Sequence, residues 1–132
     1  MKRVFIYSHD TVGLGNIRRI LSISTYLLNA IPDLSILIAT GSPMIQSFQT
    51  PKRLDYVKLP CLSRTQREEY SVKYLDWTIL DIMRLRSDLI RSAVLSFRPD
   101  IMLIDKKPYG IKNELKETLD MVKATLPRTK RI

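Results

Sequence analysis

The fold is decided between residues 4 and 28, which read VFIYSHDTVGLGNIRRILSISTYLL. An apolar run rich in β-formers comes first, then a loop with two close glycines, and then the opening of a helix. From Asn16 onward the apolar residues follow one helical face, and Ser24 is the one weak place in it. The apolar positions of this face are Ile17, Ile20, Leu21, Leu27, Leu28 and Ile31. This order predicts a strand–loop–helix unit with Asn16 as the helix N-cap.

Two arginines, Arg18 and Arg19, stand in the first turn of this predicted helix. The helix dipole makes a cation there unfavourable by roughly 0.3–1 kcal/mol. Gly13 and Gly15 would let the backbone approach a ligand, and the free amides of a helix N-terminus attract anions. Glycines, amides and guanidinium groups together predict an anion site. The alternative, that both arginines simply point into solvent, stays open at this stage.

Length and composition limit the kinds of site to expect. The chain has 132 residues, of which 45% are hydrophobic, which fits one domain with a real core. No apolar run approaches the ~18–20 residues that cross a bilayer, and the N-terminus lacks the pattern of a signal peptide. Cys61 is the single cysteine and His9 the single histidine, so a disulfide, a zinc site or a Ser-His-Asp triad is improbable. We therefore expect no metal, no cofactor and a cytoplasmic protein.

The charge is strongly basic, with 22 basic and 13 acidic side chains and a net charge of +9. Such an excess is typical of proteins that bind nucleic acid, an anionic membrane face or phosphorylated ligands. The basic residues are scattered, except for the closing run 128–131. Because no predicted helix has a basic stripe and no aromatic platform accompanies the charges, we expect no nucleic acid as a partner.

The rest of the chain alternates strands with helices. Strands are expected at 3–8, 34–40, 55–59 and 101–104, and helices at 16–30, 43–48, 77–97 and 112–124. Asp76 is expected to cap the longest helix, and the polar stretch 61–74 is expected to be a long loop. This alternation predicts an α/β fold, a Rossmann-like parallel sheet with helices on both faces.

In such a sheet the loops after the first and fourth strands lie side by side, where the winding reverses. The 9–16 loop and the 105–110 loop should therefore face each other across one crevice. Asp105 then becomes a residue of interest, although it could also be an ordinary turn aspartate. The dinucleotide fingerprint is missing, because Arg18 stands where its third glycine would be, and the sequence contains no P-loop.

Three segments resemble a known family: RVFIYSHDTVGLGNIRR at 3–19, LSILIATGS at 34–42 and PDIMLIDKKPYG at 99–110. They are similar to the start of a predicted glycosyltransferase family of GT-B architecture, which is itself similar to the lipid-linked peptidoglycan N-acetylglucosaminyltransferase. The resemblance implies an N-terminal domain that binds the acceptor, while a second domain binds the nucleotide sugar, usually without a metal. A nucleotide sugar and an acceptor are the implied partners of the full-length protein, together with a peripheral contact at the membrane face.

The resemblance also implies which residues line the cleft. The positions that carry over are Gly13, Gly15, Asn16, Arg18, Asp105, Pro108 and Gly110. Related enzymes often place a histidine directly after the second loop glycine, in some as the catalytic base. Because that position is Asn16 here, His9 or Asp10 would have to supply a base.

A GT-B chain is considerably longer than this one. We therefore expect residues 1–132 to be a single, incomplete Rossmann-like domain, the truncated N-terminal half of such an enzyme, without its C-terminal nucleotide-sugar domain and inactive alone. The alternative is a non-catalytic anion- or phosphate-binding module. The fourth strand should be an exposed edge, or the tail from Thr129 should form a short, poor fifth strand. In either case Leu115, Leu119 and Val122 are expected to be partly exposed.

Overall fold

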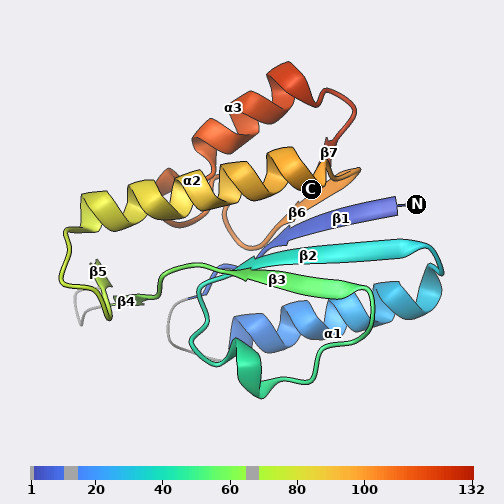
Figure 1. Cartoon of the computed structure of the whole chain (residues 1–132), viewed down its shortest axis with the longest axis horizontal. Helices are drawn as coiled ribbons and strands as arrows, with labels where there is room; N and C mark the ends of the chain where they lie inside the picture. The colour runs from blue at the N-terminus through green and yellow to red at the C-terminus, as the bar shows by residue number, and fades with distance from the viewer. Residues whose placement is uncertain (1, 11–14, 65–68) are drawn as a thin grey trace.

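The computed structural model of the chain describes residues 2–10, 15–64 and 69–132. Five parallel strands form one sheet in the order β3-β2-β1-β6-β7. These strands are β1 (Lys2–Tyr7), β2 (Leu34–Thr40), β3 (Leu54–Lys58), β6 (Ile101–Ile104) and β7 (Lys130–Arg131). Helices lie against both faces of the sheet (Figure 1). The prediction of a Rossmann-like α/β fold with helices on both faces is confirmed.

The helices are α1 (Gly15–Ala30), α2 (Ile79–Phe97) and α3 (Lys116–Thr125), with short 3-10 turns η1 (Ile45–Ser47) and η2 (Ile111–Asn113). Side chains of β1 alternate between the two faces, as the pleat requires. Phe5 and Tyr7 pack with residues of α2 and α3, whereas Val4 and Ile6 pack with residues of α1. The central strand is therefore buried on both sides, and its carboxyl end is held rigidly.

Two predicted helix caps are wrong, and the last helix begins at Lys116 rather than at Lys112. Helix α1 begins at Gly15, so Asn16 lies inside it and is not the N-cap. Its side-chain amide instead donates a hydrogen bond to the carbonyl of His9. Helix α2 begins at Ile79, and the hydroxyl of Thr78 accepts a bond from the Asp81 amide at 3.1 Å. Thr78 has the extended backbone of an N-cap, so Asp76 does not cap this helix.

The stretch expected to be a long loop forms a hairpin where the structure describes it. Strands β4 (Leu62–Arg64) and β5 (Tyr70–Val72) pair in antiparallel fashion. Leu62 is fully buried and clusters with Ile82 of α2 and Ile111 of η2. This packing overrides the polar composition of the segment and fixes the hairpin at the carboxyl end of the sheet.

The tail does supply the fifth strand: β7 pairs with Ile101 and Met102 of β6. The expected exposure of the last helix is wrong, however. Leu115, Leu119 and Val122 are 0%, 8% and 0% exposed, respectively. They belong to one apolar cluster with residues of the sheet and of α2. This cluster is buried although the fifth strand, β7, is short.

Arg53 shows how a helix end is closed in this fold. Its backbone is left-handed, with φ +69°. Its guanidinium donates to four carbonyls at the end of α1 and the start of β2, at 2.7–3.1 Å. The accepting residues are Leu28, Ile31, Pro32 and Leu34. These bonds satisfy carbonyls that a helix C-terminus leaves open.

Candidate functional site

The loops after β1 and β6 meet, as the topology predicts. The Asp105 amide donates to the carbonyl of Tyr7 at 3.1 Å, and the His9 amide donates to a carboxylate oxygen of Asp105 at 3.3 Å. Asp105 is therefore more than a turn residue, because its side chain joins the two loops. We call this meeting point, formed by His9, Asp10, Asn16, Arg19 and Asp105, the His9 crevice.

The arginine in the crevice is Arg19 rather than Arg18. Its guanidinium lies 2.6 Å from the Asp105 carboxylate, whose side chain is only 9% exposed. Arg18 instead stands 6.0 Å from the ring centre of Phe48 and lines a groove along α1. Consecutive helical residues point about 100° apart, so only one of the two can face the crevice. The interpretation that both arginines point into solvent fails for Arg19.

His9 is buried where the two loops meet and is 7% exposed. Its Nε2 is 3.3 Å from the hydroxyl of Tyr70, a residue of strand β5 in the hairpin. Its Nδ1 is buried without a hydrogen-bond partner among the described residues. Burial, aided by Lys106, lowers the pKa of His9 below its ordinary value of 6.5. The imidazole is therefore neutral at pH 7 and can accept a proton.

Asp10 is almost fully buried beside the end of β2. One carboxylate oxygen accepts a hydrogen bond from the Thr40 hydroxyl. The other oxygen is buried with no partner within the described part of the chain. Burial raises the pKa of Asp10, and the bond from Thr40 opposes that rise. A carboxylate in this position costs stability, which is a common feature of functional sites.

A buried ion pair lies beneath the crevice. Arg86 of α2 donates to both carboxylate oxygens of Glu114, at 2.8 and 2.9 Å, and both side chains are 0% exposed. Arg86 also donates to the carbonyl of Pro60 at 2.7 Å, and the hydroxyl of Tyr7 donates to Glu114. The same hydroxyl accepts a bond from the Ile111 amide at 2.9 Å. One network therefore ties together the end of β1, helix α2 and the segments that follow β3 and β6.

Sequence reasoning missed this network, although a signal for Arg86 was present. Arg86 lies four residues after Ile82 and four before Ile90, on the buried stripe of α2. A charged residue on a buried stripe requires an internal partner. The Arg86 side chain also explains the glycine at position 41, because a Cβ there would stand 2.9 Å from the Arg86 guanidinium.

The remaining predicted residues are three glycines and Pro108. Gly13 is outside the described residues. Gly15 is exposed at the start of α1, and an added Cβ would meet nothing within 4 Å. Gly110 is buried, with φ +72°, and a Cβ there would stand 2.9 Å from the Tyr7 ring, so packing explains this glycine. Pro108 lines a neighbouring cavity of about 420 Å³. Within the described ranges no cluster of three His, Cys, Asp or Glu side chains can hold a metal ion.

Comparisons with known proteins support the fold alone. No protein-family model matches the sequence, and no curated protein does. Among solved structures, the chain is similar to a ugt transferase from Siraitia grosvenorii, crystallised in complex with UDP, at a TM-score of 0.56 and 14% sequence identity. The match covers 100% of this chain and 24% of the other, so the chain spans about a quarter of that protein's length. The fold is glycosyltransferase-like.

Proposed function

We propose that this chain is the acceptor-side domain of a glycosyltransferase that uses a nucleotide sugar. The observation that supports it most is the His9 crevice. A neutral histidine and two carboxylates stand at the carboxyl ends of β1 and β6, within a glycosyltransferase-like fold. Open parallel sheets bind their ligands at this edge.

The proposed chemistry needs one base. An acceptor hydroxyl forms a bond to the anomeric carbon, the bond from that carbon to the nucleoside diphosphate breaks, and the hydroxyl proton goes to the base. His9 suits this role because its imidazole is neutral and Asp105 holds its backbone amide. The Tyr70 hydroxyl is 3.3 Å from Nε2, so an acceptor hydroxyl that gives its proton to this nitrogen would replace Tyr70 as its partner. Asp10 is the second candidate base, and its raised pKa favours proton uptake.

The donor would be held elsewhere. The structural neighbour was crystallised with UDP, and this chain corresponds to about a quarter of it. We propose that a separate domain supplies the nucleotide-sugar site, as in the GT-B family that the sequence resembles, and that residues 1–132 do not transfer sugar alone. The relation to the lipid-linked peptidoglycan N-acetylglucosaminyltransferase belongs to the same proposal.

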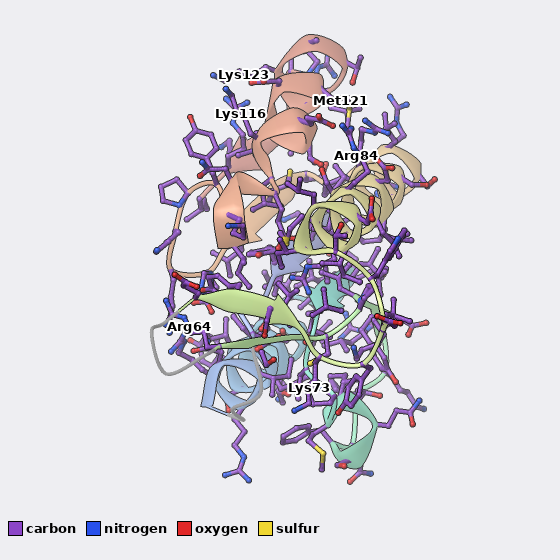
Figure 2. All side chains as sticks on the ribbon, turned by 90° about the vertical axis from the view of Figure 1, so that its left-hand side faces the viewer. Arg64, Lys73, Arg84, Lys116, Met121 and Lys123 are labelled. Carbon is purple, nitrogen blue, oxygen red and sulfur yellow. The ribbon has the colours of Figure 1, made fainter. Side chains whose placement is uncertain are left out.

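A peripheral contact with an anionic membrane face fits the surface beside the crevice. Large apolar side chains are exposed where β5 leads into α2, with Tyr74 69% and Leu80 78% exposed and Trp77 between them. Lys73 and Arg84 flank this stretch, on the side that Figure 2 presents to the viewer. Aromatic and basic residues together favour the interface of an anionic bilayer. No helix within the described residues is long and apolar enough to cross a membrane.

The alternative, a non-catalytic anion- or phosphate-binding module, finds less support at this crevice. Arg19 is already paired with Asp105 at 2.6 Å, so an anion would have to displace a carboxylate. Arg18 remains exposed but lies over Phe48.

Turnover of nucleotide sugars tests the proposal. The isolated chain should release no nucleoside diphosphate from a panel of nucleotide sugars and hydroxylated acceptors. Joined to a nucleotide-sugar-binding domain of the GT-B type, it should show turnover that His9→Ala lowers by about 10²–10⁴-fold. Turnover by the isolated chain, or full activity of the joined His9→Ala variant, would contradict the proposal.

A further inference from the structure

A basic cavity lies at the amino ends of the strands, at the end of the sheet opposite the His9 crevice. A cavity of about 350 Å³ lies between the starts of β1 and β6 and the residues that follow α2 and α3. Arg3, Arg98 and Arg128 line it, together with a single acid, Asp100. We call it the arginine cavity. Since β1 extends about 3.3 Å per residue, this cavity lies roughly 20 Å from the crevice.

Arg98 has a left-handed backbone conformation, which glycine adopts more easily than arginine. It is the C-cap of α2 and has φ +51°, in the left-handed region. Glycine is the usual residue there, and other L-residues pay about 1–2 kcal/mol for that conformation.

Arg53 shows what a structural role looks like. That residue is also left-handed, and its guanidinium donates to four carbonyls at a helix end. The side chain of Arg98 makes no hydrogen bond or ion pair with any described residue, and that of Arg128 makes none either. The capping that explains Arg53 does not explain these two arginines.

The one acid in the cavity does not neutralise them. Asp100 accepts a hydrogen bond from the backbone amide of Arg3 at 2.8 Å and forms no ion pair with the three arginines. The Arg3 side chain donates one bond, from Nε to the carbonyl of Arg98 at 3.2 Å. Three arginines against one aspartate leave the lining with a net charge of +2 (3 − 1).

We propose that the arginine cavity binds a phosphate-bearing anion of the diphosphate class. Guanidinium groups bind phosphate oxygens in pairs, through two parallel N–H bonds, and three of them suit a ligand with several such oxygens. The site lies at the amino ends of the strands, away from the proposed acceptor crevice.

Titration with inorganic diphosphate at about 0.15 M salt, where long-range attraction is screened, tests the site. The parent chain should bind diphosphate. Arg98→Gly should raise the dissociation constant about tenfold or more, because charge-assisted hydrogen bonds are stronger than neutral ones. Glycine suits the left-handed backbone, so this variant should fold at least as well as the parent. Arg128→Ala should also bind more weakly.

Arg84→Ala is the matched control, because it removes the same charge from an exposed ion pair with Glu117. It should bind diphosphate like the parent. Absence of binding by the parent, or equal weakening in Arg98→Gly and Arg84→Ala, would overturn the proposal. Vesicles that contain phosphatidic acid identify the source of the phosphate. Vesicle binding that Arg98→Gly weakens indicates a lipid headgroup, whereas vesicle binding that Arg98→Gly leaves unchanged indicates that the cavity takes a soluble diphosphate.

Discussion

Removing one partner of the Arg86–Glu114 pair is the sharpest perturbation of the structure around the crevice. Glu114→Leu leaves the Arg86 guanidinium without acceptors for bonds of 2.8 and 2.9 Å, at a site that is 0% exposed. Breaking a buried pair from one side costs about 3–5 kcal/mol. That is a large share of the ~5–15 kcal/mol that stabilises a typical domain.

Urea unfolding at pH 7 measures this loss as a lower midpoint with an unchanged slope. Glu117→Gln is the control, because Glu117 is 53% exposed and pairs only at the surface, and it should cost about 0–1 kcal/mol. Replacing both partners, with Arg86→Met added to Glu114→Leu, should recover at least half of the loss, since no buried charge remains. If Glu114→Leu costs no more than Glu117→Gln, the pair does not hold the crevice together.

Four further outcomes follow from the described contacts. Because burial lowers the pKa of His9 below 6.5, unfolding takes up a proton as the pH falls through 6.5, and stability drops there; the urea midpoint should fall less between pH 8 and 5 in His9→Gln, and an equal fall would refute this. Burial raises the pKa of Asp10 above 3.8, so its charge costs stability above that pH; Asp10→Asn should melt higher at pH 7 and like the parent near pH 3.5, and a lower melting point at pH 7 would contradict the reasoning. Gly110→Ala should cost more than about 1 kcal/mol, because its φ is +72° and Tyr7 is in the way, whereas Gly15→Ala should be close to neutral in the same melt. The fluorescence of Trp77, the single tryptophan, should shift to the blue with anionic vesicles and stay unchanged with neutral ones; the same shift with both, or with neither, would exclude charge-dependent docking.

Elements with a long periodic pattern could be predicted from the sequence. Strands β2 and β6 have the expected bounds, because continuous apolar runs between turn residues have few alternatives. Helix α1 begins at Gly15, one residue earlier than expected, so the positions of its first polar residues on the helix differ from those predicted. Asn16 lies in the first turn, where its side chain contacts His9, and Arg19 rather than Arg18 contacts Asp105.

The rest depends on contacts between distant residues. The hairpin exists because Leu62 packs on α2 and η2, which a three-residue strand with a serine does not reveal. Glu114 lies 28 residues from Arg86, so nothing local pairs the two. The meeting of His9 with Asp105 could be predicted, because it follows from strand order alone. The contact between Tyr70 and His9 could not be predicted, because it requires the hairpin.

Amide chemical shifts of the isolated chain, followed during titration with hydroxylated acceptors, test the central claim most directly. Acceptors should perturb the amides of His9, Asp10 and Asp105, and a nucleotide sugar alone should leave them unchanged. Arg19→Ala should alter that pattern, since Arg19 contacts Asp105 at 2.6 Å. Perturbation of these amides by the nucleotide sugar, or acceptor shifts confined to other parts of the chain, would contradict an acceptor site at the carboxyl ends of β1 and β6.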